Sequence, residues 1–562
     1  MTYTFLNTLL GAALVVKFVL GYSLIHQPII FLSSTIHIQL ILTALWVIWL
    51  APIVSPLRKF PLAPQGPWWK TFLLEPEPDD LERYMRSTPN DGLIRYFGVF
   101  HDERLLITKP QGTKDMMLLQ PYNFNKLAIS RKLIGHLTGR GLVIVDQEEH
   151  KRQRKAMAPA FKFKHIKNLF PKFWFHATRL VQALEDHIDR TTEESAMGCR
   201  IDVDNWLMRT TLDVIASAGF GVNVNATQAP DNELARLLPL AMTTSSRATF
   251  YRLLGSLLPE WLYFRLPMER KFEIDRMKKA LHNATMPLIE ARKAAFSRRE
   301  TLDPEAGEDK NTGDFADTDV IATLLRFPHP PSDEELLAQS ATIMVAGQDT
   351  TSVATTWALY LLAHHPNVQA ALRHEVQTHL PSPDSKTESV DAPLVESLPF
   401  LAAVCSETLR LFPPAPILRR QVAKPGTTLL GEHLPVGTQV ATSIWGTHHS
   451  ESIWGLDADQ FKPERFLRQA ENGKLKFDPH GGLEGEAATY SFVPFGAGVR
   501  SCIGERFARG EFAILLAVLV GKFDWTLTNP KAKMGDDVVL NFSLIIKPQG
   551  GLSLMARKIE GW

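Results

Sequence analysis

Hydrophobic and polar positions divide the chain into an apolar start and a long globular remainder. Within residues 1–57 the only charged side chain is Lys17, and ordinary mixed composition begins at Arg58. Residues 29–51 carry no charge, and a helix of about 20 apolar residues is enough to cross a bilayer. The pattern predicts an amino-terminal membrane anchor over 1–57 with a span at about 29–51.

The flanks of this span support the anchor. Trp46 and Trp49 suit the boundary between lipid and water, and Arg58 and Lys59 follow as expected on a cytoplasmic side. A cleaved signal peptide fits less well, because the start carries no basic residue and the apolar stretch is too long. A weaker run at 9–25 is either a second span or an interfacial segment.

Beyond the anchor, the pattern predicts one large unit. Prolines recur through 58–67, and this segment is predicted to be a stiff linker. Alternation over 90–110 predicts a pair of strands, and 120–300 is mainly helical in pattern. No composition shift separates two cores, so we expect 68–562 to be a single domain, mainly α with a minor β region. Three polar stretches are predicted to be surface loops: 301–319, 381–393 and 469–489.

Charge and cysteine content exclude several classes of protein. The chain has 61 basic and 60 acidic residues, a balance that argues against nucleic acid as a partner. Its three cysteines, Cys199, Cys405 and Cys502, are too few and too scattered for a disulfide framework or a zinc site. At least one thiol is unpaired, which suits a reducing compartment.

A long helix with an unusual centre is predicted over 332–365. Ser332 and Glu335 form a capping pattern, and Pro366 ends the run. At ~1.5 Å per residue this helix is about 50 Å long. Its centre, 346–351, reads AGQDTT, which includes a glycine, an acid and two threonines that helix interiors disfavour. Either a ligand approaches here, with a hydroxyl to hold it and an acid to pass protons, or the helix is kinked with a polar side in water.

Two charged motifs follow. Glu407 and Arg410, spaced i and i+3, share one helical face and can pair. The prolines at 413–416 end that helix and favour an extended segment. Arg465 in the downstream FKPERF is a candidate third member of the cluster. We interpret these residues as a structural ion-pair network.

Residues 492–504, FVPFGAGVRSCIG, carry the strongest chemical signal. Glycines surround Cys502 and allow tight turns, and an apolar helix follows. A cysteine before a helix start lies where the amide N–H groups favour the thiolate, a nucleophile and metal ligand. The alternative is a packed core thiol like Cys405. A dinucleotide fingerprint fails because Ser501 occupies its third glycine position.

A basic stretch at 150–167 carries seven Lys or Arg residues and no acid. Without interleaved aromatic residues it does not suit nucleic acid. A docking face for an acidic partner protein and a solvated helix face are the two readings that remain open.

Four motifs, taken together and in this order, resemble the motifs of the cytochrome P450 family, the haem-thiolate monooxygenases: AGQDTT, ETLR, FKPERF and FVPFGAGVRSCIG. The resemblance extends from about residue 65 to the carboxyl end. The cysteine motif matches the family pattern FxxGxRxCxG at every specified position. The resemblance implies the cytochrome P450 fold, a single large haem domain behind an amino-terminal anchor, with haem b as the cofactor.

The resemblance also assigns roles. Cys502 is the axial ligand of the haem iron, and Phe495 lies near its sulfur. Asp349 and Thr350 are the acid–alcohol pair that delivers protons. Glu407, Arg410 and Arg465 form a structural triad. The propionate-binding candidates are Arg500, Arg420, Arg154 and His150, where histidine replaces the tryptophan of the family's WxxxR. The substrate-facing candidates are Phe124, Met344, Val345, Ile417, Leu418, Ser543 and Leu544.

In function, the resemblance implies a monooxygenase that inserts one atom of dioxygen into a lipophilic small molecule. Electrons come from NADPH through a flavoprotein reductase. Long, anchored members suggest the endoplasmic reticulum membrane, a catalytic domain facing the cytosol, and secondary metabolism such as terpenoid or polyketide tailoring. The alternatives are a haem-thiolate isomerase or dehydratase without a reductase, a membrane-tethered haem-binding protein that is not an enzyme, and a membrane scaffold with coincidental motifs.

Overall fold

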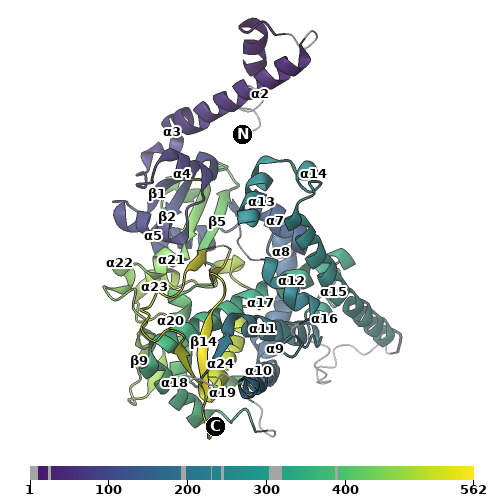
Figure 1. Ribbon diagram of the computed structural model, residues 1–562, viewed down its shortest axis with the longest axis vertical. Helices are drawn as coiled ribbons and strands as arrows, with labels where there is room; N and C mark the ends of the chain where they lie inside the picture. The colour runs from purple at the N-terminus through teal and green to yellow at the C-terminus, as the bar shows by residue number, and fades with distance from the viewer. Residues whose placement is uncertain are drawn as a thin grey trace.

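The computed structural model describes residues 11–22, 27–191, 198–229, 231–241, 246–302, 319–385, 390–542 and 544–562. Figure 1 shows an amino-terminal helical segment projecting from a body in which helices surround small sheets. The projecting rod is Pro28–Val54, with a mean hydropathy of 1.9 and only 6% of its window buried. In the described part of the chain it is the one helix long and apolar enough to cross a membrane. It consists of α2 (Pro28–Leu45), η1 (Trp46–Leu50) and α3 (Ala51–Val54).

The weaker apolar run at 9–25 is described only in part. Residues 11–18 are helical, whereas 9, 10 and 23–25 lie outside the described residues. Ala12 and Val16 of this short helix have no accessible surface.

The proline-rich segment is docked on the body rather than free. The Ala63 N–H donates to the Arg95 carbonyl, and the Arg95 N–H donates to the Pro61 carbonyl, both at 2.8 Å. Leu57 and Phe60 are buried in a core cluster beneath the sheet. The predicted linker therefore extends the fold.

The main sheet joins segments far apart in sequence. Its first two strands form the antiparallel pair predicted over 90–110, and the next strand, β8, is parallel to β2. In spatial order the strands are β1 (Leu93–Gly98), β2 (Asp102–Ile107), β8 (Gln439–Ser443), β5 (Ile417–Val422) and β3 (Phe124–Asn125). β5 is the extended segment expected after the prolines.

Smaller sheets complete the β region. The stretch at 469–489, predicted as a loop, contains the second strand of a hairpin and the helix α23 (Gly485–Ser491), so it is more ordered than expected. The small sheets are β11 (Phe523–Leu527) with β14 (Ser553–Lys558) and β4 (Cys199–Asp202), β9 (Leu467–Gln469) with β10 (Leu475–Phe477), β12 (Leu540–Phe542) with β13 (Ile546–Pro548), and β6 (Thr428–Leu429) with β7 (Glu432–His433).

The predicted long helix is α17 (Asp333–His364), which runs through the centre of the body (Figure 1). The Ser332 hydroxyl accepts the Glu335 N–H at its start, as the capping pattern predicted. A Cβ on Gly347 would lie 3.0 Å from Ile215, so this glycine also lets a neighbouring helix approach. The helices packed against α17 include α11 (Val203–Phe220), α20 (Pro399–Leu411) and α24 (Glu505–Lys522).

The remaining helices cover this centre and the sheet. They are α4 (Trp68–Leu73), α5 (Pro78–Ser87), α6 (Pro110–Lys114), α7 (Ala128–Thr138), α8 (Gln147–Met157), α9 (Phe163–Lys167), α10 (Phe170–Arg190), α12 (Glu233–Ala241), α13 (Ser246–Leu257), α14 (Glu260–Tyr263), α15 (Glu269–Leu302), α16 (Val320–Leu325), α18 (Pro366–His379), α19 (Ala392–Glu396), α21 (Ile444–His448) and α22 (Glu451–Trp454). The loops predicted at 301–319 and 381–393 lie largely or partly outside the described residues.

Candidate functional site

The cysteine loop folds back on itself just before α24. Gly496 and Gly498 have φ of +70° and +68°, a region that favours glycine. A Cβ on Gly498 would lie 2.3 Å from the Met117 carbonyl oxygen. The Cys502 N–H donates to the Phe495 carbonyl at 2.8 Å and closes the turn. The glycines therefore fix where the sulfur stands.

Cys502 differs from the two other cysteines in its exposure. Cys502 is exposed whereas Cys199 and Cys405 are buried. Even so, burial raises the pKa of the Cys502 thiol, more than the Gly504 N–H and Arg154 lower it. The helix start therefore does not outweigh the effect of burial on this thiol.

An accessible strip lies in the middle of α17. Residues 338–362 are buried except for Ala346, Gly347 and Thr350. The Thr350 hydroxyl donates to the Ala346 carbonyl at 2.8 Å. Because the rest of this helix is enclosed, the strip faces the interior rather than bulk water. Of the two readings of this polar centre, the one with a ligand beside the helix fits better.

Asp349 lies beside this strip but is held from another direction. Its side chain is 4% exposed, and Lys547 Nζ lies 2.9 Å from its Oδ1. Its Oδ2 is buried without a hydrogen-bond partner. Burial raises the pKa of Asp349, and the Lys547 ammonium opposes this rise. Sequence reasoning missed Lys547, and its one signal was a lone lysine in the apolar run that ends in IIKP.

A basic cluster lies around the sheet end of the cysteine loop. Arg500 donates to the Phe124 carbonyl at 2.7 Å and pairs with Asp146. Burial and then Arg500 lower the pKa of Arg420 to about 10. Burial, more than the neighbouring charges, lowers the pKa of Lys126 to about 7, although Asp146 raises it. These three cations share a single acid, Asp146, among the groups that act on them, so the cluster is short of negative charge.

The predicted basic helix contributes two more members. Burial, then Lys126 and the neighbouring arginines, lower the pKa of His150 to about 3, and its ring lies 3.1 Å from the Tyr122 hydroxyl. Arg154 donates to the Ser501 carbonyl at 2.5 Å, so it braces the residue next to the cysteine. Lys126 was missed at the level of sequence because nothing in its neighbourhood marks it.

The charged motifs form a buried network. Arg410 Nε lies 2.7 Å from Glu407 Oε2, and both side chains are 0% exposed. Arg465 Nε lies 3.5 Å from Glu407 Oε1. Arg410 also donates to the His448 carbonyl at 2.7 Å, and the His448 ring accepts the Val493 N–H at 3.2 Å. The network thus reaches the start of the cysteine loop.

A second buried acid, Glu511, lies on α24. It is 1% exposed, and neither carboxylate oxygen has a hydrogen-bond partner. Burial raises its pKa well above the ordinary range, more than Thr351 lowers it. Burial therefore favours the neutral form of Glu511, a residue that sequence reasoning did not single out.

The substrate-facing candidates divide into three groups. Ile417 and Leu418 are half-buried and Leu544 is 50% exposed, so these side chains have surface to offer a ligand. Ser543 lies outside the described residues. The remaining three side chains are buried in core clusters, and their expected contact with substrate gains no support: Phe124, Met344 and Val345.

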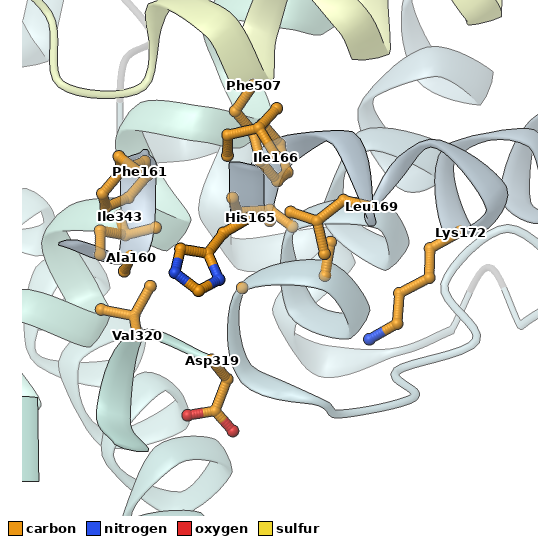
Figure 2. Close-up of a pocket in the computed structure, with 13 residues that line it drawn as sticks. Ala160, Phe161, His165, Ile166, Leu169, Lys172, Asp319, Val320, Ile343 and Phe507 are labelled. Atoms are coloured by element: carbon orange, nitrogen blue, oxygen red, sulfur yellow. The ribbon is translucent and has the colours of Figure 1, made fainter. Parts of the chain in front are cut away.

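A separate pocket lies away from Cys502. It lies between α9, α10, α11, α16 and α17, and its cavity volume is about 20 Å³, room for about one water molecule. Figure 2 shows the His165 ring among apolar neighbours, with Asp319 and Lys172 at its border. Asp319 pairs with Arg292 at 2.7 Å, and Lys172 donates to the Ser217 carbonyl at 3.2 Å. These polar groups are engaged in holding the fold.

Comparison with known proteins identifies relatives over nearly the whole chain. The family model described as "Cytochrome P450" matches residues 67–550. Cytochrome P450 monooxygenase sphH of Aspergillus fumigatus is 33% identical, covering 91% of this chain and 90% of its own. Cytochrome P450 monooxygenase FUM15 of Gibberella moniliformis is 32% identical, with 91% and 90% covered. Ganoderic acid synthetase CYP5150L8 of Ganoderma lucidum is 28% identical, with 88% and 93% covered.

Proposed function

We propose that this chain, which belongs to the cytochrome P450 family, inserts one atom of dioxygen into a lipophilic small molecule of secondary metabolism. Family membership and monooxygenase relatives make it an oxidoreductase with haem as its cofactor. The cysteine loop before α24, with Cys502 exposed at a point fixed by two glycines, carries the proposal. Among lipophilic molecules, we propose terpenoids or polyketides as the first substrates to test.

The residues present fit haem. Cys502 is an exposed cysteine, and the described residues hold no group of three or more His, Cys, Asp or Glu side chains able to bind a metal. A single thiolate therefore suits an iron whose other ligands come from a porphyrin. The excess positive charge of Arg500, Arg420 and Lys126 suits the two carboxylates of haem propionates, and the neutral His150 can donate a hydrogen bond.

When bound, haem supplies the activation of dioxygen, which thiolate ligation favours. The chain supplies protons and support. Asp349, with one unpartnered oxygen, exchanges a proton, and Thr350 on the accessible strip passes it on. The Arg509 guanidinium lies 4.8 Å from the centre of the Phe495 ring, and Arg154 holds Ser501, so the cysteine is fixed from both sides. The triad of Glu407, Arg410 and Arg465 braces the same loop.

We assign the electron supply to an NADPH-dependent flavoprotein reductase. The segment 150–167 presents exposed lysines on α8 and α9 and the turn between them, which suits an acidic partner. They are Lys151, Lys155, Lys162 and Lys164. We further propose that Pro28–Val54 anchors the chain in the endoplasmic reticulum membrane with the catalytic domain on the cytosolic face. The basic Arg58 and Lys59, which follow the apolar rod, support this orientation.

Two measurements test the function. The full chain is co-expressed with a reductase in a host without related enzymes, and its reduced carbon monoxide spectrum is recorded. Wild type and Cys199→Ala are expected to give the thiolate-specific band, and Cys502→Ala is expected to lose it. A Cys502→Ala protein that keeps the band contradicts the ligand assignment.

The reaction is tested by profiling products with terpenoid and polyketide scaffolds. Product that depends on NADPH and reductase is expected. Product formed from a peroxide substrate without reductase identifies the isomerase or dehydratase. Haem with no substrate-dependent oxygen consumption identifies a carrier.

A further inference from the structure

One ammonium group and two carboxylates meet beside the central helix. Lys547 Nζ lies 2.9 Å from Asp349 Oδ1, with side chains 13% and 4% exposed. The Met208 sulfur on α11 lies 4.0 Å from the same nitrogen. Asp204, one helical turn before Met208, is buried, and its Oδ1 has no hydrogen-bond partner. Lys547 therefore pairs with one acid while a second acid beside it stays unpaired.

The position of this ammonium is set by the hairpin β12–β13. The Ile546 N–H donates to the Pro414 carbonyl, and the Ile546 carbonyl accepts from Trp357 Nε1, both at 3.0 Å. These bonds tie the residue before Lys547 to α17 and to the loop ahead of β5. The hairpin turn carries the exposed Leu544. Lys547 thus links Asp349 to an exposed hairpin turn.

The charges around this cluster are unevenly balanced. Burial raises the pKa of both acids, for Asp204 to about 6, and Lys547 lowers both. Asp204 also feels the negative charges of Asp349 and Asp202. Lys547 is the one charged group among those that shift the pKa of Asp349.

We propose that Lys547 is the positioning residue of Asp349: its ammonium holds Oδ1 and so leaves Oδ2 to exchange the proton. This rests on the proposed function, in which Asp349 delivers protons. The proton comes from water, binds the unpartnered Oδ2 and leaves toward Thr350, so the carboxylate is restored. Lys547 keeps its own protons throughout, and no oxidant or reductant takes part.

Thermal unfolding of the haem-loaded full chain tests the pairing. Lys547→Met leaves Asp349 buried without its cation, so the folded state holds a proton that the unfolded state releases. Stability then falls as pH rises. We expect the loss in Tm of Lys547→Met to be larger at about pH 8 than at about pH 6. Adding Asp349→Asn should remove that pH dependence. Lys531→Met, at an exposed lysine ahead of the hairpin, is the matched control.

Oxygen consumption supported by NADPH and reductase tests the role. Lys547→Met should lower the rate about 10-fold or more and raise the solvent deuterium isotope effect, because a misplaced acid slows proton transfer. Lys547→Arg should retain most of the rate.

The results separate this proposal from the function it rests on. If Lys547→Met behaves like Lys531→Met in both Tm and isotope effect while the thiolate band is intact, the positioning role is wrong and the function stands. If the wild type lacks the thiolate band, the proposed function itself fails.

Discussion

Two glycines of the cysteine loop make a matched test of what sets the sulfur in place. Gly496 and Gly498 have nearly equal φ, +70° and +68°. A Cβ on Gly496 has 3.8 Å to its nearest neighbour, a Leu418 methyl, whereas a Cβ on Gly498 would lie 2.3 Å from the Met117 carbonyl oxygen. Alanine at either position is expected to introduce the same backbone strain. Only Gly498→Ala adds a steric clash with the backbone of Met117.

The expected magnitudes follow from these two terms. A left-handed conformation costs a non-glycine residue about 1–2 kcal/mol. Overpacking that forces backbone to move adds about 1–3 kcal/mol. We therefore expect Gly498→Ala to lose roughly 2–5 kcal/mol of unfolding free energy and Gly496→Ala about 1–2 kcal/mol. Gly431→Ala, with φ +80° and no atom within 4 Å, measures strain away from the loop.

Denaturant unfolding and haem content measure the outcome. Gly498→Ala should also bind less haem with a thiolate-type spectrum, because the shifted loop moves Cys502. Equal stability and equal haem content for Gly498→Ala and Gly496→Ala would refute the steric reasoning.

Three further predictions use other parts of the chain. Arg410→Met should lower the unfolding free energy by about 3–5 kcal/mol in denaturant titration, because Glu407 is left buried and unpaired; a loss under about 1 kcal/mol contradicts the network. Asp204→Asn should raise Tm at neutral pH and leave it unchanged near about pH 4. The reason is that the pKa of Asp204 in the folded state, about 6, lies above its pKa in the unfolded state, so that its contribution to stability falls as pH rises between these two pKa values. An equal gain in Tm at both pH values would argue against titration of Asp204. Deleting residues 1–54 should release the protein from membranes without unfolding it, whereas deleting 1–64 should also destabilise it, because it removes apolar side chains buried under the sheet; fractionation and Tm measure the two effects.

The sequence was informative where local rules decide. The alternation over 90–110 is the pair β1 and β2. The Ser332 cap and Pro366 bound the central helix within a residue of the expected ends. The i and i+3 spacing of Glu407 and Arg410 did produce an ion pair. Each of these rests on neighbours in the chain, which a pattern can reveal.

Partners distant in sequence could not be predicted. Lys547 meets Asp349, and Lys126 joins Arg500 and Arg420, only because the fold brings distant segments together. The state of Cys502 depends on burial, which a local helix-start argument does not contain. For the same reason the burial of Met344 and Val345 was not foreseen, since their side of α17 is decided by the packing of neighbouring helices.

The docked proline segment has a consequence for how the domain stands at a membrane. A flexible linker would let the body rotate and turn any of its faces toward the lipid. Here the chain that follows Pro28–Val54 is hydrogen-bonded along β1 through Pro61 and Ala63. With Pro28–Val54 in a bilayer, these bonds would limit how far the body turns about the anchor.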